Sequence, residues 1–189
     1  MAERKISEKS LENLKRFNRE NNAITRESIE ISLLQLLEKK DLKKITISEL
    51  VQRAGVSRAA FYRNYDSKEE ILESIFQSSI AKITKSLDGY NLKTDLYQVW
   101  VYLLKEVKKE AKIISLAIDY NFEQVLTKAV YDFLEKRNGS SSNGAGSYLN
   151  SFWSSAIVSV ISKWVKDGMK TPAEKIAKLG LPLFPQKKK

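Results

Sequence analysis

The fold class that the sequence predicts is all-α. Apolar residues recur at the three- and four-residue spacing of a helix along most of the chain. No segment keeps the alternation of polar and apolar residues that a half-buried strand requires. Glycine and proline, which interrupt helices, number only 7 and 3 in 189 residues. Helices joined by short turns are therefore expected throughout.

The first three predicted helices lie before residue 66. The first starts near Thr25, and its apolar stripe consists of Ile29, Leu33, Leu36 and Leu37. The second begins at Thr46, whose hydroxyl forms a capping box with the carboxylate of Glu49 three residues later. Gly55 ends this helix where a left-handed residue is needed, and Ser57 can cap the third helix.

A fourth, long helix is predicted from Ser67, which forms a second capping box with Glu70. Asp88 and Gly89 mark its end. Further helices are expected at about 94–109, 111–118, 121–136, 147–167 and 172–179. The run 138–146 is rich in Gly, Ser and Asn, and is expected to be a flexible loop.

Net charge and the residue types that are absent restrict the function. The chain carries +10 in total, and residues 39–65 hold seven cations against two acids, which favours a nucleic-acid partner. With no Cys and no His, thiolate metal sites and the commonest general base are excluded, so we expect no metal, no cofactor and no enzymatic activity. No apolar run is long enough to cross a membrane, and the N-terminus lacks the apolar run of a signal peptide. We therefore expect a cytoplasmic protein.

Residues 47–65 have the pattern of a helix-turn-helix, in which the second of two short helices enters the DNA major groove. Phe61 and Tyr65, four residues apart, supply the inner face of that second helix. Its outer arc consists of Arg58, Ala59, Tyr62 and Arg63. Each arginine can bind a guanine edge through two hydrogen bonds, and small side chains let the backbone approach the bases. Double-stranded DNA is therefore the expected partner.

The run from Ala54 to Leu72 resembles the signature of the tetracycline-repressor (TetR) family, and the resemblance covers about residues 25–76. It implies a two-fold dimer with a three-helix DNA-binding part and a C-terminal part that dimerises and usually binds an effector. It implies base contacts by Ser48, Arg58, Ala59 and Arg63, with Ala60 close to the bases. It implies phosphate contacts by Thr46, Ser57, Tyr62, Asn64 and Lys68. Asn64 and Tyr65 stand where the family often has His and Phe, yet Asn64 can still bond a phosphate and Tyr65 can still pack.

The chain is therefore expected to have four parts. These are an N-terminal extension at 1–22, a helix-turn-helix domain at 23–66, a helical dimerisation and regulatory domain at 67–182 and a basic tail at 183–189. The extension carries six cations and four acids. It is either an arm that follows the DNA backbone or minor groove, or a solvated segment whose acids dilute its positive charge.

The helix expected at 147–167 has no charged residue from Tyr148 to Ser162. A helix with neither face charged is buried on both sides, and a two-fold dimer needs a self-complementary surface. We therefore predict that one side packs on its own domain and that the other meets a partner subunit. The predicted dimer contacts are Phe152, Ser155, Ala156, Ser159 and Trp164. The alternative is an internal core helix of a monomer.

Control of the protein is open to two hypotheses. In the first, a small-molecule effector binds among the aromatic residues Tyr97, Trp100, Tyr120, Tyr131 and Trp153, although aromatics at helical spacing more often pack a core. The chain is then a repressor that binds a palindromic operator as a dimer. In the second, a protein partner controls a regulator or activator that has no small-molecule effector. The runs 164–168 and 171–174 support it, because they resemble a branch of small TetR regulators that includes partner-controlled activators.

Overall fold

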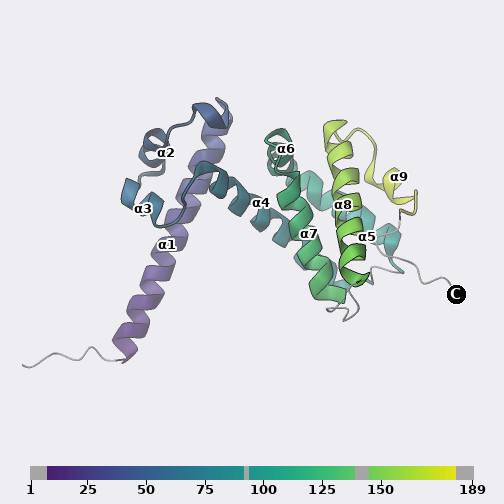
Figure 1. Cartoon of the computed structure of the whole chain (residues 1–189), viewed down its shortest axis with the longest axis horizontal. Helices are drawn as coiled ribbons and strands as arrows, with labels where there is room; N and C mark the ends of the chain where they lie inside the picture. The colour runs from purple at the N-terminus through teal and green to yellow at the C-terminus, as the bar shows by residue number, and fades with distance from the viewer. Residues whose placement is uncertain (1–7, 92–93, 139–144, 182–189) are drawn as a thin grey trace, which may run out of the picture. The chain divides into compact units, whose positions relative to one another are not determined.

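The computed structural model describes residues 8–91, 94–138 and 145–181, and every regular element in these ranges is a helix (Figure 1). The all-α prediction is confirmed. The predicted basic tail at 183–189 and most of the predicted loop at 138–146 lie outside the described residues. The chain divides into two compact units, Met1–Leu72 and Glu73–Lys189. Within the described ranges, no helix is long and apolar enough to cross a membrane.

The first unit begins with α1 (Glu8–Leu37), a helix of 30 residues drawn in purple in Figure 1. The sequence predicted a start near Thr25, but the helix begins at Glu8, since residues 8–24 contain neither glycine nor proline. The described part of the predicted extension at 1–22 is therefore helical, while residues 1–7 lie outside the described residues. Its apolar side chains are at helical spacing but exposed, Leu11 at 42% and Phe17 at 60%.

Short elements follow α1 and include the two helices of the helix-turn-helix, which Gly55 separates. They are the 3-10 turn η1 (Leu42–Lys44), α2 (Ile47–Ala54), α3 (Arg58–Tyr62) and the first turn of α4 (Lys68–Lys85). The Thr46 hydroxyl accepts from Glu49 N at 3.2 Å, and the Ser57 hydroxyl accepts from Ala60 N at 3.0 Å. Gly55 follows α2 in the left-handed conformation, with φ of 67°. The predicted caps at Thr46 and Ser57 and the stop at Gly55 are confirmed.

The two predicted capping boxes are only half formed. The N-cap hydroxyls accept as expected, and Ser67 accepts from Glu70 N at 3.1 Å. The carboxylates do not return to their own N-caps. Instead, Glu49 accepts from Lys40 Nζ, and Glu70 accepts from Asp66 N at 2.6 Å. Each carboxylate thus ties its helix to the segment that precedes it.

Helices α1, α2 and α3 enclose the core of the first unit. Its fully or almost fully buried side chains include Ile29, Leu33, Leu36, Leu42, Ile45, Leu50, Phe61 and Tyr65. The Tyr65 hydroxyl donates to the carboxylate of Glu30 on α1, and the Arg26 guanidinium lies 4.5 Å from the centre of the Tyr65 ring. Because a buried hydroxyl without a partner is costly, this bond explains how a tyrosine is accommodated in the core.

The second unit contains the rest of α4 and a set of helices that follow it. They are η2 (Ser86–Gly89), α5 (Leu96–Lys109), α6 (Ala111–Asp119), α7 (Glu123–Asn138), α8 (Ala145–Lys166) and α9 (Ala173–Ala177). α7 packs beside α8, and α9 packs on α5 (Figure 1). Trp100 Nε1 donates to Leu181 O and Trp164 Nε1 donates to Thr171 O, both at 2.7 Å. These bonds fasten the segment after α8 to α5 and α8.

Candidate nucleic-acid interface

The starts of α2 and α3 present the predicted base-reading side chains on one exposed surface. Ser48, Arg58 and Ala59 are exposed, and Ala60 is half-buried behind them. The Arg58 guanidinium donates from Nη2 to the Ser48 hydroxyl, which joins the first residue of α3 to α2. Arginine has five N–H donors, so one bond orients the guanidinium while others can reach a guanine edge.

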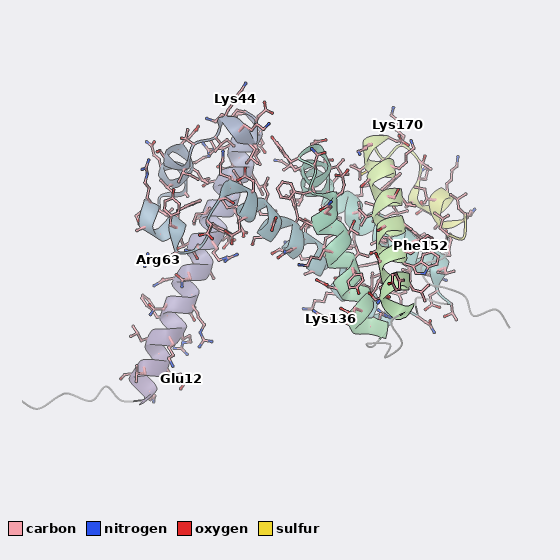
Figure 2. All side chains as sticks on the ribbon, viewed as in Figure 1. Glu12, Lys44, Arg63, Lys136, Phe152 and Lys170 are labelled. Carbon is pink, nitrogen blue, oxygen red and sulfur yellow. The ribbon has the colours of Figure 1, made fainter. Side chains whose placement is uncertain are left out.

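The other end of α3 carries Tyr62 and Arg63. Arg63 is the C-cap residue and is exposed; Figure 2 labels it. Arg58 and Arg63 lie at opposite ends of α3, roughly 7.5 Å apart along its axis, which corresponds to about two base-pair steps. Tyr62 is 57% exposed, and its ring packs edge-on against the buried Phe61 with centroids 5.1 Å apart. The contact with buried Phe61 therefore holds the exposed Tyr62 ring in place.

The predicted phosphate contacts differ in how many donors they retain. Thr46 and Ser57 are exposed, and both use an oxygen lone pair in the helix caps, so the hydroxyl hydrogen can donate to a phosphate. Asn64 is half-buried, and its Nδ2 donates to Ala60 O at 2.8 Å. One amide hydrogen of Asn64 then remains for a phosphate.

Lys68 has a structural role that the sequence did not predict. Its half-buried Nζ donates to Leu42 O at 2.7 Å and to Ile45 O at 2.6 Å. These carbonyls belong to η1 and to the residue just before Thr46, the N-cap of α2. Lys68 therefore holds the loop that positions Thr46, and two of its three N–H donors are used there. Its phosphate contact stays a prediction that rests on the third.

Only part of the positive charge in residues 39–65 is free on the surface of the first unit. Lys43 and Lys44 on η1 are exposed, and Figure 2 labels Lys44. Other cations of the cluster stabilise the unit itself: Lys40 pairs with Glu49, and Arg53 Nε donates to Gln35 Oε1 at 2.9 Å. The net charge of this segment thus overstates the number of cations that can meet phosphates.

The predicted dimer contacts on α8 divide into an exposed and a buried set. Phe152 is 62% exposed, Ser155 and Ser159 are exposed, and Ala156 is half-buried. Trp164 is 4% exposed and bonded to Thr171 O within its own unit. Trp164 therefore belongs to the core of the second unit and does not lie on the exposed face with the other four.

The aromatic residues predicted to bind an effector do not line the apolar cavity of the second unit. Tyr97 is 41% exposed, whereas Trp100 is 1% exposed and bonded to Leu181. Tyr120 and Tyr131 are half-buried, and the Tyr131 hydroxyl lies 3.1 Å from Ser147 Oγ. Trp153 is half-buried, with Nε1 buried and without a partner among the described residues. Their part in effector binding stays a prediction.

Two helices joined at a glycine turn, with arginine and small side chains exposed at the start of the second, define a helix-turn-helix DNA-binding protein. Comparison with family models then gives the family. Residues 33–75 match the model of bacterial regulatory proteins of the tetR family, and residues 91–181 match the model of a transcriptional regulator C-terminal region. The chain belongs to the TetR family of transcriptional regulators, which is not a family of enzymes.

Individual relatives agree with this placement. The chain is 34% identical over 95 residues to the HTH-type regulator YxbF of Bacillus subtilis (strain 168). This match covers 50% of the present chain and 23% of YxbF. The chain is 27% identical over 125 residues to the dhaKLM operon transcriptional activator DhaS of Lactococcus lactis subsp. lactis (strain IL1403). This match covers 61% of the present chain and 66% of DhaS. The matched region thus spans less than two thirds of the length of either relative.

Solved structures show the same fold. A TetR transcriptional regulator from Streptococcus agalactiae 2603V superposes with a TM-score of 0.58 at 20% identity, and the superposition covers 87% of the present chain and 96% of the Streptococcus chain. The structure of the dihydroxyacetone kinase operon activator DhaS superposes with a TM-score of 0.54 at 19% identity, and the superposition covers 83% of the present chain and 92% of the DhaS chain.

Sequence reasoning missed the residues that position the interface. Glu30 and Lys40 are the clearest, because they bond Tyr65 and Glu49 respectively. The presence of tyrosine where the family often has phenylalanine was a usable signal, since its buried hydroxyl requires a partner. Lys40 gave no such signal, because one lysine of a charged cluster resembles the next in sequence.

Proposed function

We propose that this chain is a repressor that binds a palindromic operator as a homodimer. The observation that carries the DNA-binding part of the proposal is the exposed, bonded pair Ser48 and Arg58, which joins α2 to the start of the recognition helix α3. Membership of the TetR family supports DNA binding, and a two-fold dimer calls for an operator with two symmetric half-sites about one helical turn or more apart. Such a regulator acts in the cytoplasm, where its DNA lies.

The exposed face of α8 supports dimerisation. Phe152, Ser155 and Ser159 follow one another at three- and four-residue spacing, so they share one side of the helix. The serines are small enough for a partner helix to approach closely, while Phe152 offers apolar area that a single copy leaves 62% exposed. A surface of this kind can meet its own copy across a two-fold axis.

The dimer surface is tested by Ser159→Arg, which places a long charged side chain on the exposed face. We expect the variant to sediment as a monomer at concentrations where the unchanged chain is a dimer. Gln124→Arg, at an exposed position of α7, is the matched control and should leave the dimer intact. A dimer that tolerates Ser159→Arg as well as the control would contradict the assignment of this face.

Repression is tested in cells by measuring the transcripts of neighbouring genes with and without the chain. We expect them to rise when the chain is deleted, and to rise in the same way when Arg58→Ala replaces it at an unchanged protein level. Transcripts that fall on deletion would refute repression while leaving DNA binding intact.

Activation is the second candidate function. Similarity to DhaS, which is named as an activator, supports it. Transcripts that fall on deletion, together with a partner protein that co-purifies with the chain, would favour this candidate.

A further inference from the structure

The first turns of α1 lie outside the core of the first unit. Every residue from Lys9 to Ile24 is exposed, and Figure 1 shows this part of the helix extending away from α2 and α3. Figure 2 labels Glu12 within it. A helical segment without a buried face is only marginally stable in water, because most helices in proteins are stabilised by packing one face. A second molecule that covers this segment would supply the missing burial.

A seam with the spacing of a coiled coil runs along the exposed side of α1. Its six residues follow one another at alternating steps of three and four positions, which places them on one face of the helix. None is charged, and four are large apolar side chains that are between 48% and 62% exposed. The seam residues are Leu14, Phe17, Asn21, Ile24, Ser28 and Ile31. Ile29 and Leu33 are fully buried and belong to a different face of α1, so the seam is separate from the core.

The charge on α1 favours a protein partner over DNA. The helix carries five cations and five acids, so its net charge is zero. Binding along a DNA backbone depends on cations that neutralise phosphates, and acids beside those cations oppose it; Arg16 lies 4.0 Å from Glu20. An uncharged apolar seam between charged flanks is instead the pattern of a helix that pairs with another helix.

The centre and the flanks of the seam favour a second copy of α1 in the parallel orientation. In a parallel pair with equivalent residues opposite one another, Asn21 meets Asn21 of the copy. An asparagine at such a position fixes the register and the two-stranded state, and the exposed Asn21 side chain has no hydrogen-bond partner within the described residues.

The acids beside the seam distinguish the two orientations. In the parallel pair, Glu20 lies beside the uncharged Thr25 of the copy, so no like charges meet there. In an antiparallel pair with the whole seam overlapped, Glu20 faces Glu27 of the copy, and the two carboxylates repel each other. The charges therefore disfavour the antiparallel arrangement.

We propose that α1 pairs with α1 of a second copy of this chain as a short parallel coiled coil along the seam. The pairing buries Phe17 and Ile24, which a single copy leaves exposed to water. It joins the DNA-binding units of two copies and is separate from the exposed face of α8. Because the seam has only four large apolar side chains, this contact is weaker than the α8 contact and forms at higher protein concentration. It does not rest on the proposed function.

Cross-linking of the full chain tests the contact and its orientation. The chain contains no cysteine, so a single introduced thiol reports one position. Ser28→Cys lies on the seam, and Ser10→Cys lies on its continuation four positions before Leu14. In a parallel pair each thiol meets its own copy within reach of a disulfide, so we expect both variants to form linked dimers with oxidised glutathione. Ala23→Cys, exposed on a different side of α1, is the matched control and should stay unlinked.

The apolar side chains of the seam are tested by the double variant Phe17→Glu, Ile24→Glu. We expect it to abolish the linking of Ser28→Cys, since charged side chains then oppose each other in the seam. Asn22→Glu combined with Ala23→Glu, at exposed positions off the seam, is the control for added charge and should link as before. Because Phe17 and Ile24 are exposed, the urea midpoint of the first unit should not change, which shows that the double variant folds.

Sedimentation of Ser159→Arg, which removes the α8 contact, separates the two contacts between copies. We expect this variant to be a monomer at low concentration and to form a dimer as its concentration is raised. Adding Phe17→Glu and Ile24→Glu should weaken that dimer by roughly a hundredfold or more, from the loss of two buried apolar side chains in each copy.

Three results would overturn the proposal. Neither seam thiol links above the level of Ala23→Cys, linking persists in Phe17→Glu, Ile24→Glu, or a mixture of Ser10→Cys and Ser28→Cys chains links the two positions to each other, as an antiparallel pair would. DNA affinity is measured on the same variants. Weaker DNA binding of the double variant, with no linking by either thiol, would assign the seam to DNA and refute the pairing, while a chain that links but binds no DNA would refute only the proposed function.

Discussion

The clamp made by Lys68 gives the most discriminating prediction. Lys68→Met keeps most of the side-chain length but removes the ammonium group that bonds Leu42 O at 2.7 Å and Ile45 O at 2.6 Å. A hydrogen bond to a charged group contributes about 1.5–3 kcal/mol to stability. Because Lys68 is half-buried and water can replace part of the lost bonding, we expect the two bonds together to contribute about 2 kcal/mol.

The assay has two parts, because loss of a structural clamp lowers the free energy of unfolding, whereas loss of a phosphate contact lowers the salt dependence of DNA binding. Urea unfolding followed by circular dichroism measures the free energy of unfolding, with the two units allowed separate transitions. Anisotropy of labelled DNA at several salt concentrations measures the slope of log K against log salt, which falls by about one for each lost phosphate contact.

For Lys68→Met we expect the transition of the first unit to shift to lower urea and affinity for all DNA to fall; a salt slope reduced by about one in addition would show that the third donor reaches a phosphate. Lys43→Met is the matched control: Lys43 is exposed, with no side-chain hydrogen bond among the described residues, so its stability should not change. Unchanged stability of Lys68→Met, combined with a slope reduced by about one, would refute the clamp and make Lys68 a phosphate contact.

Further substitutions in the helix-turn-helix test its caps and its base-reading side chain. Gly55→Ala should lower the free energy of unfolding of the first unit by about 1–2 kcal/mol, because φ at this position is 67° although no atom lies within 4 Å of the added Cβ. Gly89→Ala introduces neither strain nor a clash and should leave the free energy of unfolding unchanged. Equal shifts of the urea midpoint for the two variants would refute the backbone argument. Thr46→Ala should cost about 1 kcal/mol, because it removes the oxygen that caps α2 at 3.2 Å; an unchanged urea midpoint would show that the cap is dispensable. Arg58→Ala should lower affinity for the preferred DNA by about 1–3 kcal/mol and leave random DNA almost unaffected, and equal losses on both would remove Arg58 from base reading.

Local chemistry explains why the helix-turn-helix was predictable from sequence. The caps at Thr46 and Ser57 and the stop at Gly55 depend on residues within three positions of one another, so a short window contains the whole signal. The length of α1 was not predictable in the same way. Leu11, Leu14 and Phe17 in its first turns are at helical spacing but exposed, so no core of the described residues fixes where the helix begins.

Contacts between distant residues explain the remaining differences. Lys68 donates to backbone carbonyls 26 and 23 positions away. Every residue has such a carbonyl, so the residue types at positions 42 and 45 do not predict these hydrogen bonds. The burial of Trp164 depends on the segment that folds back after α8, where Thr171 O accepts its Nε1. Periodicity placed Trp164 on the apolar side of α8, but it could not distinguish the part that faces the core from the part that faces solvent.

The most direct test of the account is selection of binding sites by the full chain from a pool of randomised double-stranded DNA. The account predicts enrichment of a two-fold symmetric sequence, with one symmetric pair of preferred bases lost when Arg58→Ala is used for the selection. No enrichment over random DNA, or the same enriched sequence with Arg58→Ala, would contradict the claim that the surface at the start of α3 reads DNA.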